Sequence, residues 1–380
     1  MKKLLLSVVL GIVVMGSGCS NQEGTVTEGK KEVILQETEA YWPTKQWRTS
    51  LPEAQGMDSS KLVELYEQLE GNDKVHSFIV VRNGYIVGEK YGGTYSEKSS
   101  HNVYSVTKSI LGAVAGIAAE EKVIKLEDRA LNFFHDVPIE NMSQAKKDLT
   151  IQHLLTMTTG FDWPEWTENK GVWTNWDNSE DQVKYYLDQQ INEEKVGKFN
   201  YSSGDPHTLS AILQQRLGKT TSEYAFEKLF EPIGMNSVRW SPDKKGISMG
   251  GAGIFMTPRD MAKFGLLYLN KGQWDGNQIV PMDWVEESIS PQAATEIPGG
   301  ENYGYYFWLT EMDGHKVYEA MGAHGQFIGV IPDLNIVAVQ TASGNDFDAL
   351  LKEYVIPAAV SEEPIKVNEE ANKRLKELME

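Results

Sequence analysis

The sequence of 380 residues has one cysteine, seven histidines and only 36 basic side chains against 54 acidic ones. A single cysteine excludes an internal disulfide, and the scattered histidines lack the spacing of zinc ligands. The formal net charge of −18 argues against a nucleic-acid partner, because phosphate-backbone binding needs clustered lysine and arginine. We therefore expect a protein without a metal site or a nucleic-acid partner.

The N-terminal apolar run, from Leu4 to Met15, is shorter than the about 20 residues that a membrane-spanning helix needs. Lys2 and Lys3 precede the run and small residues follow it, which is the order of an export signal. The segment resembles a bacterial lipoprotein signal, although Gly16 stands where that pattern usually has a leucine. The resemblance implies that residues 1–18 are removed and that Cys19 carries fatty acyl chains such as palmitate. The protein would then be exported and anchored to the bacterial cell membrane; a plain secretory signal is the alternative.

Differences in composition divide the rest of the chain into a tether, a folded domain and a C-terminal helix. Residues 19–41 are polar and lack periodicity, which is typical of a flexible tether. We expect one folded domain over 42–360 and a charged C-terminal helix within 361–380. The oligomeric state is left open by the sequence.

Strand patterns lie at both ends of the folded region, and helical patterns fill its middle. Asn83-Gly84 between two β-prone runs predicts a hairpin. Expected strands cover 77–82, 85–91, 303–309, 316–321, 326–331 and 335–340, and expected helices cover 58–69, 150–157, 181–190, 208–217, 346–355 and 369–379, with a further helix starting at Thr257. Tight turns between consecutive strands favour an antiparallel sheet. The sequence thus predicts an α+β fold whose sheet combines both chain ends around an inserted, mostly helical subdomain, with a ligand site between the two.

Ser105 and Lys108 stand where a polar stretch gives way to an apolar helix. Positions i and i+3 share a helix face, so the Lys108 amine can lie beside the Ser105 hydroxyl. The stretch from Ser109 to Glu120 is apolar or small on all sides, which indicates a buried helix. Burial lowers the pKa of a lysine and lets its amine act as a base toward a serine. Ser-x-x-Lys alone also occurs by chance on ordinary solvated helices, so other residues must support this interpretation.

Two further segments carry candidate residues. Tyr201, in the loop Asn200 to Asp205, can direct its hydroxyl into a cleft, where a neighbouring lysine ammonium would lower its pKa; an ordinary turn with a packing tyrosine is the alternative. The segment Gly322 to Phe327 leads into a strand, and an N–H at this strand edge can face the N–H of Ser105 as an oxyanion donor. A tight turn between strands is the other interpretation.

Together the segments resemble the serine β-lactamase and penicillin-binding-protein superfamily, and most closely its class C β-lactamase-like branch of esterases, amidases and D-amino-acid peptidases. Ser105-Val-Thr-Lys108 matches the nucleophile motif, Tyr201-Ser-Ser203 matches Tyr-x-Asn at its tyrosine, and Ala323-His-Gly325 matches Lys-Thr-Gly or His-x-Gly at its glycine. The resemblance covers about residues 50 to 360. It implies a serine hydrolase in which Ser105 forms an acyl-enzyme and Lys108 and Tyr201 share the acid–base work, a mechanism that needs no metal or organic cofactor.

The same resemblance implies an oxyanion hole of the Ser105 and Gln326 N–H groups, with Phe327 as the second candidate, and a substrate contact through Ser203, His324 and Gly325. Ser203 replaces an asparagine of the lactamases, and the lysine of Lys-Thr-Gly is absent. These departures favour esters or amides, in the manner of carboxylesterases and 6-aminohexanoate-oligomer hydrolases. A true β-lactamase or penicillin-binding carboxypeptidase, and a non-catalytic cell-envelope binding lipoprotein, are the alternatives.

Three other sequence features have more than one interpretation. Gly246-Ile-Ser-Met-Gly250 fits the nucleophile elbow of α/β-hydrolases, but it lacks the preceding strand and following helix, so we interpret it as a loop. His324 could serve as a general base, although it has no acidic neighbour in sequence to orient it. Trp163, Trp166, Trp173 and Trp176 crowd one acidic segment, and we expect them to form either an aromatic wall of the substrate cleft or a cover over the core.

Overall fold

Strands from the two ends of the chain pair in one sheet. The computed structural model describes residues 41–165, 170–296, 301–344 and 346–380. The predicted export signal, Cys19 and nearly all of the expected tether lie outside these ranges. From Ala40 to Glu380 the chain forms one compact unit.

The large sheet has eight strands in the order β2-β1-β13-β12-β11-β10-β9-β8. Its strands are β1 (Val75–Arg82), β2 (Tyr85–Tyr91), β8 (Ala293–Ala294), β9 (Asn302–Tyr303), β10 (Trp308–Met312), β11 (His315–Gly322), β12 (Gln326–Ile331) and β13 (Ile336–Ala342). β1 and β13 are antiparallel neighbours, with Ile79 opposite Val339, so the early hairpin completes the late sheet. The predicted α+β architecture is confirmed.

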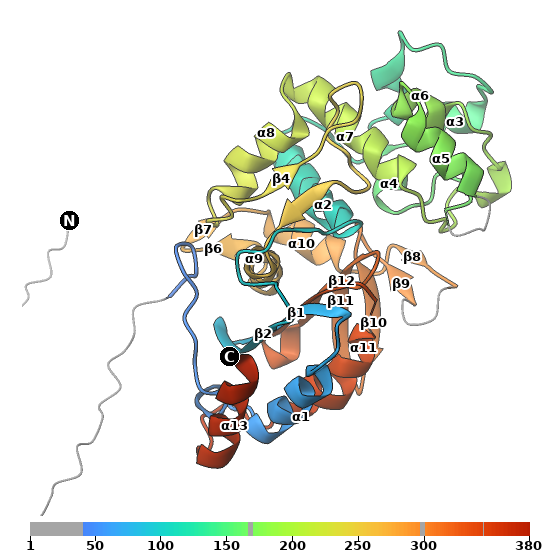
Figure 1. Ribbon diagram of the computed structural model, residues 1–380. Coiled ribbons are helices and arrows are strands. Elements are labelled where there is room, and N and C mark those ends of the chain that lie inside the picture. The colour runs from blue at the N-terminus through green and yellow to red at the C-terminus, as the bar shows by residue number, and fades with distance from the viewer. Residues whose placement is uncertain (1–40, 166–169, 297–300, 345) are drawn as a thin grey trace, which may run out of the picture. The chain divides into compact units, whose positions relative to one another are not determined.

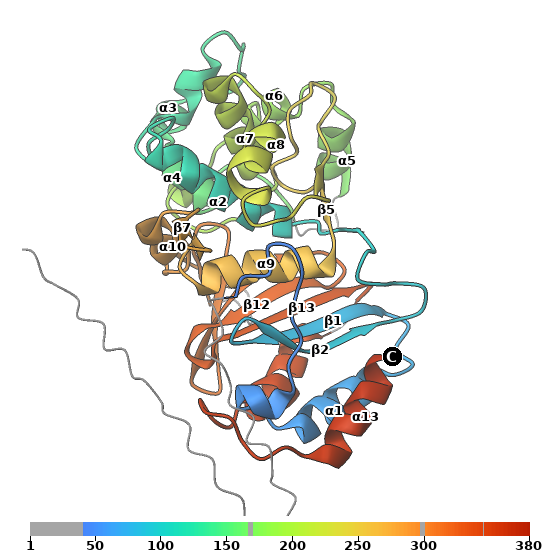
Figure 2. The same ribbon diagram turned by 90° about the vertical axis from the view of Figure 1, so that its left-hand side faces the viewer.

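Helices cover both faces of this sheet. The helices are α1 (Ser59–Leu69), α2 (Val106–Glu120), α3 (Gln144–Asp148), α4 (Ile151–Leu155), α5 (Lys170–Asn178), α6 (Gln182–Leu187), α7 (Gly204–Leu217), α8 (Thr221–Ala225), α9 (Pro258–Leu269), α10 (Met282–Ser288), α11 (Phe347–Leu350), α12 (Ile356–Ala358) and α13 (Glu369–Met379). α9 lies across β1, β12 and β13 on one face, and α1 and α13 pack together on the other (Figure 1, Figure 2). The inserted block from α3 to α8 gathers beyond α2, as the sequence predicts. None of the helices within the described ranges has the length and apolarity needed to cross a bilayer.

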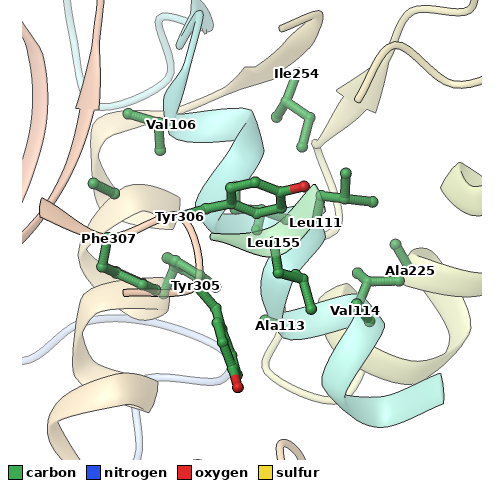
Figure 3. Close-up of a cluster of buried hydrophobic side chains, with 14 of the residues drawn as sticks. Val106, Leu111, Ala113, Val114, Leu155, Ala225, Ile254, Tyr305, Tyr306 and Phe307 are labelled. Atoms are coloured by element: carbon green, nitrogen blue, oxygen red, sulfur yellow. The ribbon is translucent and has the colours of Figure 1, made fainter. Parts of the chain in front are cut away.

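Helix α2 is the centre of the larger hydrophobic core. Its residues from Val106 to Ala118 are buried, and Val106, Leu111 and Val114 lie among side chains from the sheet and the helical block (Figure 3). A Cβ at Gly116 would stand 2.3 Å from the Trp284 ring, so glycine permits this close packing. The serine and lysine at the start of α2 are therefore held by a rigid support.

The single strand predicted over 303–309 is wrong. The structure has β9 and β10 instead, with a break at Gly304 to Phe307 in which Tyr306 has φ of 63°. Tyr305 donates its N–H to Ser288 O at 3.1 Å, and Ser109 Oγ donates to Tyr306 O at 2.6 Å. The backbone leaves the sheet here because the two tyrosine rings pack against α2 (Figure 3).

Three short strands outside the large sheet were not predicted and bear on the site. They are β3 (His101–Asn102), β4 (Arg239–Trp240) and β5 (Ile254–Met256), in the order β3-β5-β4. A separate small hairpin joins β6 (Gln273–Trp274) and β7 (Asn277–Gln278). β3 ends just before Ser105, and pairing with β5 brings the loop ahead of β5, which contains Gly251, toward the start of α2.

Candidate active site

Ser105 occupies the N-cap position of α2 and lines a cavity. Its side chain makes no capping hydrogen bond, so the hydroxyl is available to other partners. The preceding Tyr104 has φ of 46°, in the left-handed region that non-glycine residues seldom adopt. Such strain persists where the surrounding structure determines the backbone, and here it brings β3 sharply into the first turn of α2.

The Lys108 amine contacts the Ser105 hydroxyl directly. Lys108 Nζ lies 2.8 Å from Ser105 Oγ, and it also donates to Gly251 O at 2.7 Å and to Ser203 Oγ at 3.2 Å. The side chain is 1% exposed. Burial lowers the pKa of Lys108 to about 8, and the negative charge of Glu165 partly opposes this effect. With this pKa, about a tenth of the amine is unprotonated at pH 7 and about half at pH 8, so a free base is available and becomes more abundant as pH rises.

Tyr201 lies on the other side of the amine. Lys108 Nζ stands 4.9 Å from the centre of the Tyr201 ring, and this ring stacks on Trp308 at a centroid distance of 5.6 Å. The prediction that the pKa of Tyr201 falls is wrong, because burial of the phenol raises its pKa and a hydrogen bond with the Ser105 side chain only partly offsets the rise. Tyr201 is consequently a neutral phenol at ordinary pH and can donate a proton rather than remove one.

Glu165 is a site residue that the sequence did not single out. Its carboxylate accepts hydrogen bonds from Ser203 Oγ at 2.5 Å and Ser203 N at 3.0 Å, and also from Trp163 Nε1. Ser203 in turn contacts Lys108, so the carboxylate is linked to the amine through one hydroxyl. The only sequence signal was an acidic residue among tryptophans, and nothing in its spacing pointed to the serine and lysine.

The hairpin between β11 and β12 forms another wall. Gly322, Ala323 and Phe327 line the cavity, whereas the Gln326 side chain is buried and donates to Ala342 O at 2.6 Å. Among the hydrogen bonds of the described residues, neither the Ser105 N–H nor the Ala323 N–H is a donor. Two unused backbone donors thus border the same space, with Ala323 three residues before the predicted Gln326.

His324 and Gly325 form the tip of this hairpin rather than the cavity wall. His324 has φ of 63°, and its ring meets the Tyr104 ring edge-on at 5.1 Å. Gly325, with φ of 89°, accepts a hydrogen bond from Gln340 Nε2 at 3.3 Å. Through Tyr104, His324 can support the residue next to the serine.

The cavity has a volume of about 1040 Å³ and a wall of aromatic and acidic side chains. The residues along it that concern the chemistry are Tyr104, Ser105, Glu165, Trp173, Tyr201, Ser203, Phe255, Trp308, Ala323, Phe327, Asp346, Phe347 and Asp348. The wall formed by described residues contains no lysine or arginine. A ligand that fills this space therefore meets three carboxylates and no surface cation.

The four tryptophans fall into different places. Trp173 lines the cavity and is 40% exposed, whereas Trp163 and Trp176 are buried in the core behind it, edge-on to each other at 5.7 Å. Trp166 lies outside the described residues. An aromatic wall and a core cover are thus both present within one segment.

The segment Gly246 to Gly250 is a loop, as predicted. β4 ends before it at Trp240 and β5 follows it, so no helix begins behind Ser248. Ser248 is 2% exposed, and its hydroxyl accepts a hydrogen bond from Ser222 N at 3.0 Å. This serine is structural.

Comparisons with known proteins place this geometry in context. A family model described as Beta-lactamase matches residues 74–360. The 6-aminohexanoate-dimer hydrolase of Paenarthrobacter ureafaciens is 24% identical over 314 residues, which cover 76% of this chain and 78% of that protein. Among solved structures, a putative 6-aminohexanoate-dimer hydrolase from Bacillus anthracis superposes with a TM-score of 0.69 at 24% identity, over 83% of this chain and 87% of its own. EstCE1, a hydrolase with promiscuous acyltransferase activity, superposes with a TM-score of 0.64 at 15% identity, over 80% of this chain and 98% of its own.

Proposed function

Because the chain belongs to the β-lactamase family of serine hydrolases, we propose that it cleaves esters or amides through an acyl-enzyme formed on Ser105. The observation that carries the proposal is the 2.8 Å contact between the buried Lys108 amine and the Ser105 hydroxyl at the cavity wall. The names of the related hydrolases are consistent with amide and ester chemistry. A binding protein without catalysis would have no use for a desolvated amine on a serine.

The proposed reaction begins with proton transfer from Ser105 Oγ to the unprotonated Lys108 amine, while the oxygen attacks the carbonyl carbon. The N–H groups of Ser105 and Ala323 stabilise the oxyanion. Ala323 takes the place of the predicted Gln326, because it lines the cavity and its N–H is not used in another hydrogen bond of the described residues. Tyr201 donates its phenolic proton to the leaving group and recovers it through Lys108. Water then attacks the acyl-enzyme by the reverse sequence, and the acid is released.

The pH dependence of the reaction tests the role of Lys108. We expect kcat/KM for a p-nitrophenyl ester to rise with pH through an apparent pKa of about 8 and to level off above it, because only the unprotonated amine is a base. Glu165→Gln removes a negative charge that raises the pKa of Lys108, so the rising limb should move to lower pH. Glu311→Gln, a change at an exposed carboxylate on β10, is the matched control and should leave the limb in place. A limb that does not move in the Glu165 variant would contradict this coupling.

The substrate preference follows from the charges of the wall. We expect kcat/KM for nitrocefin to be far below that for p-nitrophenyl butyrate. A β-lactam brings a carboxylate into a space lined by Glu165, Asp346 and Asp348 without a lysine or arginine, where it would lose hydration and gain no partner. The two substrates are compared at equal pH and ionic strength. Nitrocefin turnover equal to or above that of the ester would instead support a true β-lactamase.

A further inference from the structure

The cavity wall is acidic where the start of α11 reaches it. We call Glu319, Asp346 and Asp348 the acidic end. Asp346 and Asp348 flank Phe347 at the start of α11 and line the cavity. Asp346 accepts the capping hydrogen bond from Ala349 N at 3.1 Å, so its carboxylate has a structural partner. The Glu319 carboxylate, in contrast, accepts no hydrogen bond from a backbone N–H of a described residue.

Glu319 lies behind the cavity wall, in contact with Asp348. It stands opposite Trp308 on β10 and Gly329 on β12, and Met321 two residues further along β11 lies on the same sheet face. Trp308, Met321 and Asp348 line the cavity, and Glu319 contacts Asp348, so the Glu319 carboxyl is buried directly behind this part of the wall. A Cβ at Gly329 would meet the Phe347 ring at 2.9 Å, so the start of α11 rests directly over this position.

The Glu319 carboxyl is unusual because it is buried without a cation. The residue is 0% exposed, and apart from the Asp348 carboxyl no described residue offers either of its oxygens a hydrogen-bond partner. Burial raises the pKa of Glu319, and the charge of Asp348 adds to the rise; burial likewise raises the pKa of Asp348. Two carboxyl groups in contact share a proton when no positive charge is near. Within the fold this pair has no stabilising role that an apolar pair would not fill better.

A cationic ligand would supply the missing partner. The described residues that line the cavity include no lysine, arginine or histidine, while Trp308, Phe327 and Phe347 line it with aromatic surface of the kind that attracts organic cations. A metal is less suited, because no set of three or more ligating side chains among the described residues has the arrangement of a metal site. We propose that the acidic end binds an ammonium group of the substrate, so that the enzyme selects cationic esters or amides. This inference rests on the proposed function and adds a substrate class to it.

Isosteric substrates test the inference. Each pair consists of an ester with a trimethylammonium group and the same ester with a tert-butyl group, so that shape is kept and only charge differs. In some pairs the trimethylammonium or tert-butyl group is on the acyl side of the ester, and in others it is on the leaving-group side, with short or long spacers. Acetylthiocholine and 3,3-dimethylbutyl thioacetate form the shortest leaving-group pair. The ratio of kcat/KM within each pair is measured for the wild type, Asp348→Asn and Asp275→Asn. The last is an exposed aspartate in the β6–β7 turn and serves as the control.

We expect at least one pair to favour the cationic ester by about tenfold or more, the effect of one charge-assisted contact. Asp348→Asn should abolish most of this preference, and Asp275→Asn should keep it. Equal or faster turnover of the neutral ester in every pair would overturn the inference while leaving the proposed function intact. If Ser105-dependent turnover is absent altogether, the proposed function fails, and calorimetry with hexyltrimethylammonium decides the site: binding that Asp348→Asn weakens supports it, and no binding refutes it.

Discussion

Replacement of Ser105 by alanine is expected to lower kcat for ester hydrolysis by about 10³-fold or more, since the nucleophile of a serine hydrolase supplies effects of this size. The hydroxyl makes no cap to α2, so its loss should change the stability of the fold little. The measurement is kcat for p-nitrophenyl butyrate, with circular dichroism and a thermal melt to show that the variant is folded.

Ser248→Ala is the matched control for this prediction. Ser248 belongs to the Gly-x-Ser-x-Gly pattern, but it is buried in a loop and is not among the residues that line the cavity. The control should retain its turnover. The opposite outcome, an active Ser105 variant and an inactive Ser248 variant, would transfer the nucleophile to the loop and discard the acyl-enzyme on α2.

Lys108→Met is expected to lower kcat by about 10² to 10⁴-fold with a much smaller change in KM, the range that a positioned general base contributes. Methionine keeps most of the volume of the side chain and removes only the amine. The carbonyl of Gly251 and the hydroxyl of Ser203 lose a donor, so some loss of stability is expected as well.

A second buried lysine separates catalysis from stability. Lys146 is also fully buried, and its amine donates to Glu140 O at 3.0 Å and Leu187 O at 2.7 Å, remote from Ser105 in the helical block. Lys146→Met should destabilise the protein and spare kcat. If Lys108→Met and Lys146→Met reduce kcat equally, the amine of Lys108 has only a structural role.

Tyr201→Phe should lower kcat through loss of the proton donor. The apparent pKa of the rise of kcat/KM with pH should stay near that of the wild type, because Lys108 is unchanged.

Much of the fold was predictable because its signals are local. Asn83-Gly84 fixes the first hairpin, and the apolar sequence after Ser105 fixes a buried helix. The i, i+3 spacing of Ser105 and Lys108 then determines that the two side chains meet. Pairing of β1 with β13 followed from unpartnered strands at both chain ends.

The remaining parts of the site depend on long-range packing. Glu165 meets Ser203 across 38 positions of the sequence, through a segment that has no periodic pattern. The pKa direction of Tyr201 was mistaken because proximity to an ammonium was expected to dominate, whereas burial has the larger effect. In the sequence, Glu319 has the pattern of an ordinary charged residue on a strand. Its burial follows only from the placement of α11 over β12.

The most direct test of the proposed acyl-enzyme is covalent labelling with a fluorophosphonate followed by mass spectrometry of the digested protein. The activated serine should acquire a single phosphonyl group, and fragmentation should assign it to Ser105. Labelling should slow strongly in Lys108→Met and proceed normally in Lys146→Met. A protein that is folded yet takes up no label, or that carries the label on another residue such as Ser248, would contradict the account.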